Sequence, residues 1–409
     1  MKKLSLLLIL LTTIVQAQIV NIPDANFKNA LISQGVDTNN DGEIQVSEAE
    51  ARLILTVNNY NISTLEGIQS FINLETLHCS NNQLTELDIS QISNLKSLAC
   101  NINALTNLDV SQNLVLEELY CEENLLTSLT IHSPNLINLN CRGNLLISLD
   151  VSQSPLLYWM NCGYNQLTSL DVSQNVNMEW FYCGENQLTS LDITQNTVLT
   201  WFNCAINQIT SLDVSQNPML SRFHCFDNQL TNLDVSQNPN LFDFACGINQ
   251  LTNLDVTQNP ILGRLFCEEN QLTSLNIKNG NNIDMTTMRA PNNPNLFCIT
   301  VDNVAYANSQ NCDDNNWCVD DWAEYSENCV FGISEIAKLN IRMYPNPVQN
   351  KLYIRTNTPI DKLQIYTLQG QLIQETKNNQ IDVSLLSSGL YFASIMIDGK
   401  SSVKKFIKK

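Results

Sequence analysis

Ten cysteines recur along the middle of the chain at a spacing of 21 residues, with one step of 20. They are Cys79, Cys100, Cys121, Cys141, Cys162, Cys183, Cys204, Cys225, Cys246 and Cys267. A thiolate can act as a nucleophile, form a disulfide or bind a soft metal ion. Side chains at equivalent positions of adjacent parallel strands point the same way, which is a poor geometry for a disulfide. We therefore interpret the ten thiols as small, buried apolar side chains without metal or redox chemistry.

Four further cysteines, Cys298, Cys312, Cys318 and Cys329, lie outside this pattern in a polar, loop-like segment. They are the candidates for disulfides in an exported protein. Of the three possible connectivities, Cys298 with Cys329 and Cys312 with Cys318 is the preferred one.

An acidic segment near the N-terminus could bind a metal ion. Residues 37–48 match the 12-residue EF-hand loop at every diagnostic position, with Gly42 where the loop turns sharply. The predicted calcium ligands are Asp37, Asn39, Asp41, the carbonyl of Glu43 and a bidentate Glu48, with Gln45 bound directly or through water. A lone loop of this kind predicts a structural Ca²⁺ rather than a sensor. A metal-free helical cap is the alternative.

Few residues are available for catalysis. The three histidines, His78, His132 and His224, fall in different repeats, and no Cys–His pair or Ser–His–Asp order with a nucleophile elbow is present. Glu118 and Glu122 could pair as the carboxylates of a glycan-active enzyme, although acidic faces are usually just solvated. We predict that the chain is not an enzyme.

Each repeat cysteine lies in the frame Leu-x-x-Leu-x-Cys-x-x-Asn-x-Leu-x-x-Leu-Asp-Val, as at residues 241–256, where Phe244 replaces the second Leu. The alternation before the cysteine predicts a short strand with one buried face. A repeat of this length with Asn at a fixed place is typical of a leucine-rich repeat solenoid. We expect a mainly β fold with a parallel sheet on the concave face, an asparagine ladder in the turns, and short extended or 3₁₀ segments on the convex side.

The composition changes at both ends of the repeats. A basic start and a short apolar run predict a cleavable signal peptide. Alternating stretches near the C-terminus predict a small Ig-like β-sandwich. The predicted segments are a signal peptide (1–18), a helical EF-hand-like N-cap (19–56), the repeats (57–290), a disulfide-containing C-cap (291–332), a linker (333–341) and the sandwich (342–409).

Charge is divided unevenly between these segments. Residues 19–332 carry 8 Lys and Arg against 35 Asp and Glu, or −27, whereas residues 333–409 carry 11 against 5, or +6. Such an acidic solenoid is repelled by phosphate backbones and anionic lipids, which argues against nucleic acid as a partner. No segment offers the ~20 consecutive apolar residues of a transmembrane helix.

Residues 74–277 resemble the internalin-type leucine-rich repeats of bacterial surface proteins. Residues 62–74 resemble the opening repeat of that family, whose helical N-terminal cap is itself similar to an EF-hand. The resemblance implies a scaffold for binding rather than a particular ligand.

The C-terminal segment resembles the type A sorting domain of the type IX secretion system. The matching residues are Tyr344, Pro345, Asn346 and Pro347, then Leu352 to Ile354, Gly389, Leu390 and Tyr391, and the terminal run Lys404, Lys405, Phe406, Ile407, Lys408 and Lys409. The resemblance implies export through the periplasm, contact with the secretion machinery, and release or attachment at the outer-membrane surface.

Three consecutive repeats carry Trp at the same outward position, at Trp159, Trp180 and Trp201. The expected ligand-binding set adds Tyr182, Arg222, His224, Phe226, Arg264 and Phe266, with Gly163, Gly184 and Ala205 leaving an open floor beside the tryptophans. Solvent-facing aromatic patches usually serve a partner. We predict a non-catalytic binding protein for a protein or glycan, with a surface spacer as the alternative. Indoles lying flat over one another to protect the sheet would be the structural explanation.

Overall fold

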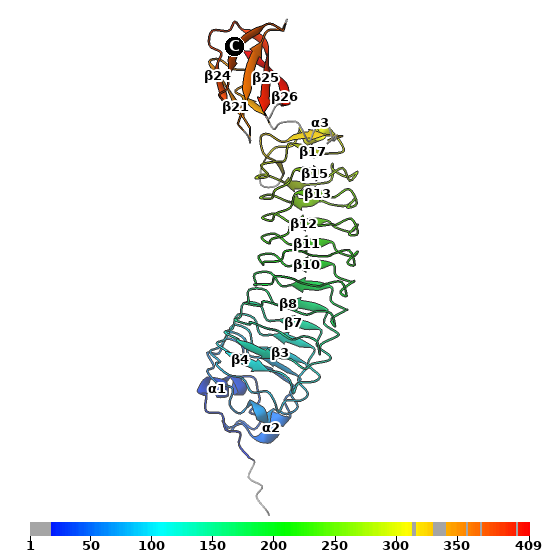
Figure 1. Ribbon diagram of the computed structural model, residues 1–409. Coiled ribbons are helices and arrows are strands. Elements are labelled where there is room, and N and C mark those ends of the chain that lie inside the picture. The colour runs from blue at the N-terminus through cyan, green and yellow to red at the C-terminus, as the bar shows by residue number, and fades with distance from the viewer. Residues whose placement is uncertain (1–17, 313–315, 330–340, 357–358, 369, 398–399) are drawn as a thin grey trace, which may run out of the picture. The chain divides into compact units, whose positions relative to one another are not determined.

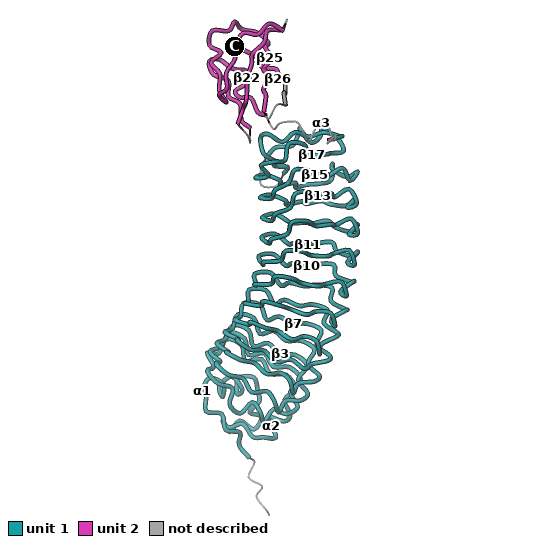
Figure 2. The backbone as a smooth tube through the Cα atoms, viewed as in Figure 1, with its two compact units in different colours: residues 1–328 teal, residues 329–409 magenta. Residues whose placement is uncertain are grey.

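The computed structural model describes residues 18–312, 316–329, 341–356, 359–368, 370–397 and 400–409. The chain forms two compact units, residues 1–328 and 329–409, which Figure 2 colours separately. Each unit has its own hydrophobic core. The predicted signal peptide up to Ala17 and most of the predicted linker lie outside the described residues. Among those residues, no helix is both long and apolar enough to cross a membrane.

Successive coils of the first unit stack their strands into one parallel sheet of 13 strands (Figure 1). These strands are β1 (Ile54–Thr56), β2 (Thr76–His78), β3 (Ser97–Ala99), β5 (Glu118–Tyr120), β7 (Asn138–Asn140), β8 (Trp159–Asn161), β9 (Trp180–Tyr182), β10 (Trp201–Asn203), β11 (Arg222–His224), β12 (Asp243–Ala245), β14 (Arg264–Phe266), β16 (Thr287–Arg289) and β18 (Trp317–Cys318). In most of them the middle residue is buried and its two neighbours face outward, as in β2. The predicted parallel sheet is therefore confirmed.

The other half of each coil, which carries the Leu-Asp-Val segment, forms what we call the back of the solenoid. Two small parallel sheets lie there. One contains β4 (Asn107–Asp109) and β6 (Ser128–Thr130), and the other contains β13 (Asn253–Asp255), β15 (Ser274–Asn276), β17 (Cys298–Thr300) and β19 (Glu324–Ser326). The short extended segments expected on this side are thus present.

The core is built from the residues that the frame predicts. Phe181, Phe202, Phe223 and Phe244 stack through adjacent coils with ring centroids 5.5 to 5.6 Å apart. The ten repeat cysteines are free and buried. Burial raises the pKa of the Cys79 thiol to about 12 and shifts the other nine upward as well. The thiols therefore stay protonated and serve as core packing.

The predicted asparagine ladder is present in the turn that follows each cysteine. Asn165 is typical: its amide nitrogen donates to the carbonyls of Cys141 (3.0 Å) and Cys162 (3.1 Å), and its oxygen accepts from the N–H of Leu146 (3.0 Å). One side chain thus satisfies backbone groups of two consecutive coils, which a turn buried inside the stack requires.

A second asparagine ladder lies at the other end of the coils, and sequence analysis missed it. Its fully buried members are Asn113, Asn175, Asn196, Asn217, Asn238 and Asn259. The amide of Asn196 donates to the carbonyls of Val172 (3.0 Å) and Asn175 (2.9 Å) in the preceding coil. The repeated Ser-Gln-Asn or Thr-Gln-Asn triplet carried this signal, because it recurs in six of the coils, while Ile92, Ser133 and Ser154 take the position of Asn in three others.

The N-terminal end of the core is covered by α1 (Ala25–Ser33) and α2 (Val46–Glu50), followed by the 3₁₀ turn η1 (Ile68–Ser70). Asp24 caps α1 by accepting from the N–H groups of Asn26 and Phe27. Its other oxygen accepts from the backbone and hydroxyl of Ser63 and from the N–H of Thr64. One carboxylate thereby fastens the cap to the first coil.

The solenoid extends beyond its predicted limits of 57 and 290. At the start, β1 lies in the segment assigned to the cap and pairs with β2. At the end, β16 and β18 extend the large sheet and β17 and β19 extend the sheet on the back. Strand pairing uses backbone groups and needs only a buried middle residue such as Leu55 or Met288. The solenoid can therefore continue where the sequence no longer has the repeat cysteine.

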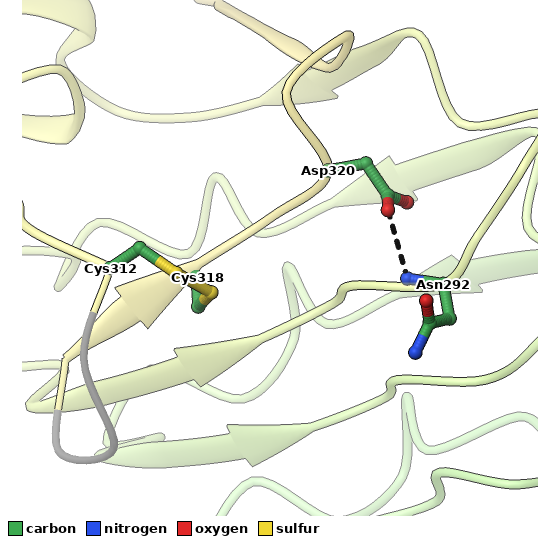
Figure 3. Close-up of a disulfide and its surroundings, with 4 residues drawn as sticks. All are labelled: Asn292, Cys312, Cys318 and Asp320. Carbon is green, nitrogen blue, oxygen red and sulfur yellow. Dashed lines mark hydrogen bonds between the residues drawn. A yellow bond between two sulfur atoms is a disulfide. The ribbon is translucent and has the colours of Figure 1, made fainter.

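The last coils are closed by α3 (Val304–Ala307), by the buried Trp317 and by a disulfide between Cys312 and Cys318 (Figure 3). This is the pairing preferred from the sequence. Cys298 and Cys329 are also disulfide-bonded. Asp320 accepts from the N–H of Asn292 (3.0 Å), as Figure 3 shows, and so joins this segment to the preceding coil.

The second unit contains two antiparallel sheets around a shared apolar core. One sheet holds β20 (Arg342–Tyr344), β21 (Lys351–Arg355) and β24 (Gln380–Asp382); the other holds β22 (Lys362–Tyr366), β23 (Leu372–Thr376), β25 (Gly389–Ile397) and β26 (Lys400–Lys408). Leu352, Leu363, Ile395 and Phe406 are among the residues buried between them. The predicted Ig-like sandwich is consistent with this arrangement.

Candidate binding face

We call the outward side of the 13-stranded sheet the sheet face. It consists of the first and third residues of each strand from β2 to β16 and the residue after each repeat cysteine. The predicted tryptophans are direct neighbours on this face, because Trp159 pairs in register with Trp180 and Trp180 pairs with Trp201. All three indoles are half-buried.

Trp180 and Trp201 do not lie flat over one another, as the structural explanation for the tryptophans would require. The rings of Trp180 and Trp201 have centroids 5.1 Å apart and are tilted by 56°. Tyr182 packs its ring against Trp201 at 4.8 Å and 65°, and the Arg222 guanidinium lies 4.8 Å from the centre of the Trp201 ring. These contacts compete for the faces of Trp201, so the indole cannot lie flat on its neighbour.

The expected open floor beside the tryptophans is a cleft of about 290 Å³. Its lining residues are Arg142, Asn161, Gly163, Tyr164, Tyr182, Gly184, Glu185, Asn203, Ala205, Ile206 and Phe226. A Cβ atom on Gly163 or Gly184 would lie 3.0 Å from the carbonyl oxygen of the next coil. The two glycines therefore allow close stacking of the coils as well as an open floor.

A charged cluster adjoins the aromatic residues on the next strands. Asp243 is 6% exposed and accepts from Arg264 at 2.9 Å, while Nε2 of His224 lies 3.6 Å from its other oxygen. Burial alone would raise the pKa of this carboxyl, but His224, Arg264 and Arg222 hold it below its ordinary value. The buried carboxylate thus holds three basic side chains close together on an acidic solenoid.

The predicted ligand-binding residues therefore form one continuous surface. The tryptophans, Tyr182, Arg222, His224 and Phe226 lie on or directly after β8 to β11. Asp243 of β12 links them to Arg264 and Phe266 of β14, where the guanidinium lies 5.3 Å from the ring centre. Asp243 itself was absent from the prediction. The sequence places Asp243 on the outward side of its strand, but only the fold shows that its side chain is buried between two arginines.

Sequence analysis also missed the outer wall of the cleft. Tyr164 and Glu185 lie two residues after Cys162 and Cys183, one position beyond the last outward-facing residue that strand alternation could predict. Both have a left-handed backbone conformation, with φ of +55°. Regular strand alternation does not extend through such a turn. The same turn position recurs in every coil. Comparing the residues two positions after each cysteine would therefore have identified this wall from the sequence.

The sheet face carries no net charge. Its acidic residues are Glu118, Glu122, Asp243 and Glu268, and its basic residues are Arg142, Arg222, Arg264 and Arg289. These four arginines are half of the basic residues between positions 19 and 332, a segment whose net charge is −27. The excess negative charge of the solenoid therefore lies on its turns, ends and back.

The two carboxylates considered for catalysis differ in their hydrogen bonding, since one carboxylate oxygen of Glu122 is buried without a hydrogen-bond partner. Glu118 accepts from the hydroxyl of Ser97 at 2.9 Å. Burial raises the pKa of Glu122, which lies in the column after the cysteines. Of the three histidines, His224 contacts Asp243, while His78 and His132 lie on other coils.

The loop 37–48 has calcium-type donors, but they do not converge. Oε1 of Glu48 accepts from the N–H and hydroxyl of Thr38 and from the N–H of Asn39, and Oε2 accepts from the N–H of Gln45. Burial alone would raise the pKa of Glu48, but these hydrogen bonds lower it. The side chain thus completes a capping box at α2.

The remaining donors of this loop also serve its turn. Asp37 accepts from the N–H of Gly42 at 3.0 Å, and Asp41 accepts from the side-chain amides of Asn39 and Gln45. In the described parts of the chain, no three acidic, histidine or cysteine side chains are grouped as a metal site. Calcium binding would therefore require the carboxylates to exchange hydrogen bonds for the ion.

In the second unit, the predicted sorting motifs lie together. The side-chain oxygen of Asn346 accepts from the N–H of Ile407 on the terminal strand β26, at 2.8 Å. Tyr391 stacks on Phe406 of the same strand with centroids 5.7 Å apart. Lys404 and Lys405 are exposed. The motif residues thus support the terminal strand and leave its lysines accessible.

Comparisons with known proteins agree with both units. Residues 342–409 match the family model described as a secretion system C-terminal sorting domain. The search of curated proteins found no match.

Among solved structures, the functional domain of InlJ from Listeria monocytogenes, which includes a cysteine ladder, is similar with 24% identity and a TM-score of 0.55. The match covers 96% of this chain and 99% of that one. Internalin InlF from Listeria monocytogenes is similar with 20% identity and a TM-score of 0.50, over 78% of this chain and 100% of that one. The Arabidopsis receptor kinase HAESA is similar with 17% identity and a TM-score of 0.51. The match covers 63% of this chain and 47% of that one. The chain therefore combines an internalin-like leucine-rich repeat fold with a C-terminal sorting domain of the type IX secretion system, and it is secreted or attached to the outer-membrane surface.

Proposed function

We propose that this protein is a non-catalytic binding protein that engages a protein partner through the sheet face, centred on Trp159, Trp180 and Trp201. The observation that carries this proposal is the concentration of tryptophan and arginine on one charge-neutral face of a strongly acidic solenoid. Burying that face would not bury the net charge of the molecule.

The composition of the face is that of an interface centre. Trp, Tyr and Arg are enriched where binding energy concentrates, and Lys is depleted there. Every basic residue that we count on the sheet face is an arginine. Arg222 and Arg264 lie against aromatic rings, which orients their guanidinium groups before a partner arrives and reduces the entropy lost on binding.

Solved structures with this fold give a further reason to favour a polypeptide over a glycan. HAESA was solved with the peptide hormone IDA and the co-receptor SERK1, and PEPR1 was solved with AtPEP1. These likenesses concern the fold, so they support the class of partner and not its identity.

The test is selection of partners by the full-length mature protein. A random dodecapeptide library displayed on phage and an array of glycans would be offered to it and to a variant with Trp159, Trp180 and Trp201 replaced by Ala. We expect peptides that bind the wild type and lose at least about 100-fold in affinity for the variant, as truncation of several central anchors would cause.

Thermal unfolding of both proteins is the control. The variant should melt within about 3 °C of the wild type, because the indoles are half-buried on the outside of the sheet. A large fall in melting temperature with binding preserved would favour a protective role for the indoles. Selection of glycans alone would redirect the proposal to a carbohydrate partner.

The sorting domain supports a location of the proposed binding outside the cell. Deleting residues 342–409 removes β20 to β26 and should leave the truncated protein in the periplasm of a host with a type IX system. Fractionation and surface labelling measure this. Normal surface display or release of the truncated chain would contradict the role of the domain.

We also propose a structural calcium site in loop 37–48. The donors would be Asp37, Asn39, Asp41, the Glu43 carbonyl and Glu48, after Glu48 gives up its contacts with Thr38 and Asn39. Calcium should raise the melting temperature of the wild type and leave that of Asp41→Ala unchanged, because oxygen donors from several side chains are needed. An identical melting temperature of the wild type in calcium and in chelator would contradict the site.

A further inference from the structure

The cleft beside the tryptophans contains one acidic group without a partner. Glu185 lines the cleft and is half-buried, and among the described residues its carboxylate makes no hydrogen bond or ion pair, although its backbone pairs with Ala205 and Asn165. The basic residue of the cleft is in the opposite situation. Arg142 forms an ion pair with Glu123, and its guanidinium lies 4.2 Å from the centre of the Tyr164 ring. The cleft therefore has an uncompensated negative charge at Glu185.

Aromatic rings form much of the remaining wall. Tyr164, Tyr182 and Phe226 come from three different coils and line the same cleft. The face of an aromatic ring attracts a cation, and the attraction grows when water is excluded. An unpaired carboxylate combined with several rings is the environment that a lysine or arginine side chain prefers.

We propose that this cleft takes a single lysine or arginine side chain of an extended polypeptide partner, with Glu185 as its counter-ion. This inference rests on the proposed function and specifies what the partner must contain. At about 290 Å³ the cleft is slightly smaller than the range of about 300–1,000 Å³ typical for drug-sized ligands, so it suits one side chain.

The charges around the cleft favour a basic occupant over other side chains. Glu123, Glu185, Asp227 and Glu269 occupy the same left-handed turn position in their coils, where the coils between them carry the uncharged residues Gly143, Tyr164, Ile206 and Ile248. An acidic side chain in the cleft would meet Glu185 with Arg142 already engaged by Glu123. An apolar side chain would cover Glu185 and leave a desolvated charge without a partner, which is costly.

The experiment uses the dodecapeptides selected on the full-length protein and compares two matched variants. Glu185→Gln removes the charge from the cleft. Glu269→Gln makes the same change at the equivalent turn position four coils away, outside the lining of this cleft. Affinities are measured by fluorescence polarisation at two salt concentrations.

We expect selected peptides to share a lysine or arginine at one position. Glu185→Gln should weaken their binding about tenfold, as the loss of one charged contact does, and Glu269→Gln less than twofold. Replacing the basic residue of the peptide by norleucine should cost a similar factor. The two losses should not add when both changes are combined, because they remove the same contact.

Two different failures can be told apart. Tryptophan-dependent peptides without a shared basic residue, or equal losses from Glu185→Gln and Glu269→Gln, would overturn this inference and leave the proposed function standing. Peptides that bind the tryptophan variant as well as the wild type, or no selected peptides at all, would overturn the proposed function and this inference with it.

Discussion

The sheet face and the back of the solenoid are built from the same repeated frame, yet they use charge differently. On the back, one aspartate in most coils accepts a hydrogen bond from the N–H two residues later, as Asp171 does from Ser173 at 2.9 Å. Equivalent bonds are made by Asp88, Asp109, Asp150, Asp192, Asp213, Asp234 and Asp255. On the sheet face, four acids are balanced by four arginines. The back thus uses acids to form turns, whereas the sheet face compensates its charges where a partner would cover them.

The largest effect on stability is expected inside the coils that join these two surfaces. Asn196→Ala removes two buried hydrogen bonds between coils, because the carbonyls of Val172 and Asn175 keep only their backbone donors, the N–H groups of Asn175 and Met178. We expect a cost of about 2–3 kcal/mol in the free energy of unfolding. Denaturant unfolding of the full-length protein measures it. The exposed neighbour provides the control, Gln195→Ala, which should cost less than about 0.5 kcal/mol. Equal costs would mean that the ladder does not stabilise the stack.

A buried aspartate should matter more than the exposed ones on the back. Asp24 accepts hydrogen bonds from α1 and from the first coil, and these bonds lower the pKa of Asp24 to about 2 although burial opposes the shift. Asp24→Ala should cost about 2 kcal/mol at pH 7.

The pH dependence of Asp24 has a definite sign. A carboxyl with a depressed pKa in the folded state stabilises the fold above about pH 4 and loses this contribution as the pH falls toward 2. The difference in unfolding free energy between wild type and Asp24→Ala should therefore shrink between pH 4 and pH 2. A constant difference over this range would contradict the assignment.

A smaller effect is expected where the sheet face compensates its charges. Asp243→Asn keeps the size of the side chain but removes the charge between Arg222 and Arg264, which should cost about 1 kcal/mol at low salt. High salt should reduce the cost, because it screens the two arginines from each other. Unfolding at both salt concentrations measures the change, and a salt-independent cost would argue against repulsion as its cause.

The smallest effect is expected on the back itself. The triple variant Asp171→Asn, Asp192→Asn and Asp213→Asn removes three neighbouring charges, but Asn can make the same turn. Its melting temperature should stay within about 2 °C of the wild type, and its affinity for selected peptides should not change. Loss of affinity would show that the partner contacts the back, which would break the comparison between the two surfaces.

The fold could be predicted because each coil repeats the same local interactions. The position of Cys246 and Asn249 within one repeat is enough to place Leu251 and Val256 in the core, and the structure confirms all of them. The ends were harder. The coil of β16 keeps the ladder asparagine, Asn293, but has Ala290 in place of the cysteine, and β18 lacks the frame. Backbone pairing with a coil already formed decides the place of both strands. The second asparagine ladder was visible as a repeated letter, but its role depends on carbonyls in the neighbouring coil.

The amino-acid sequence by itself determined which residues face inward, which columns face outward and that three tryptophans must be neighbours, because strand alternation and a constant repeat length are local properties. Only the tertiary structure decided how these side chains meet. The tilt of Trp180 against Trp201, the burial of Asp243 between arginines and the opening of Glu185 into the cleft each depend on residues from different coils. Side-chain packing and desolvation are set by neighbours in space, and a single repeat does not contain them.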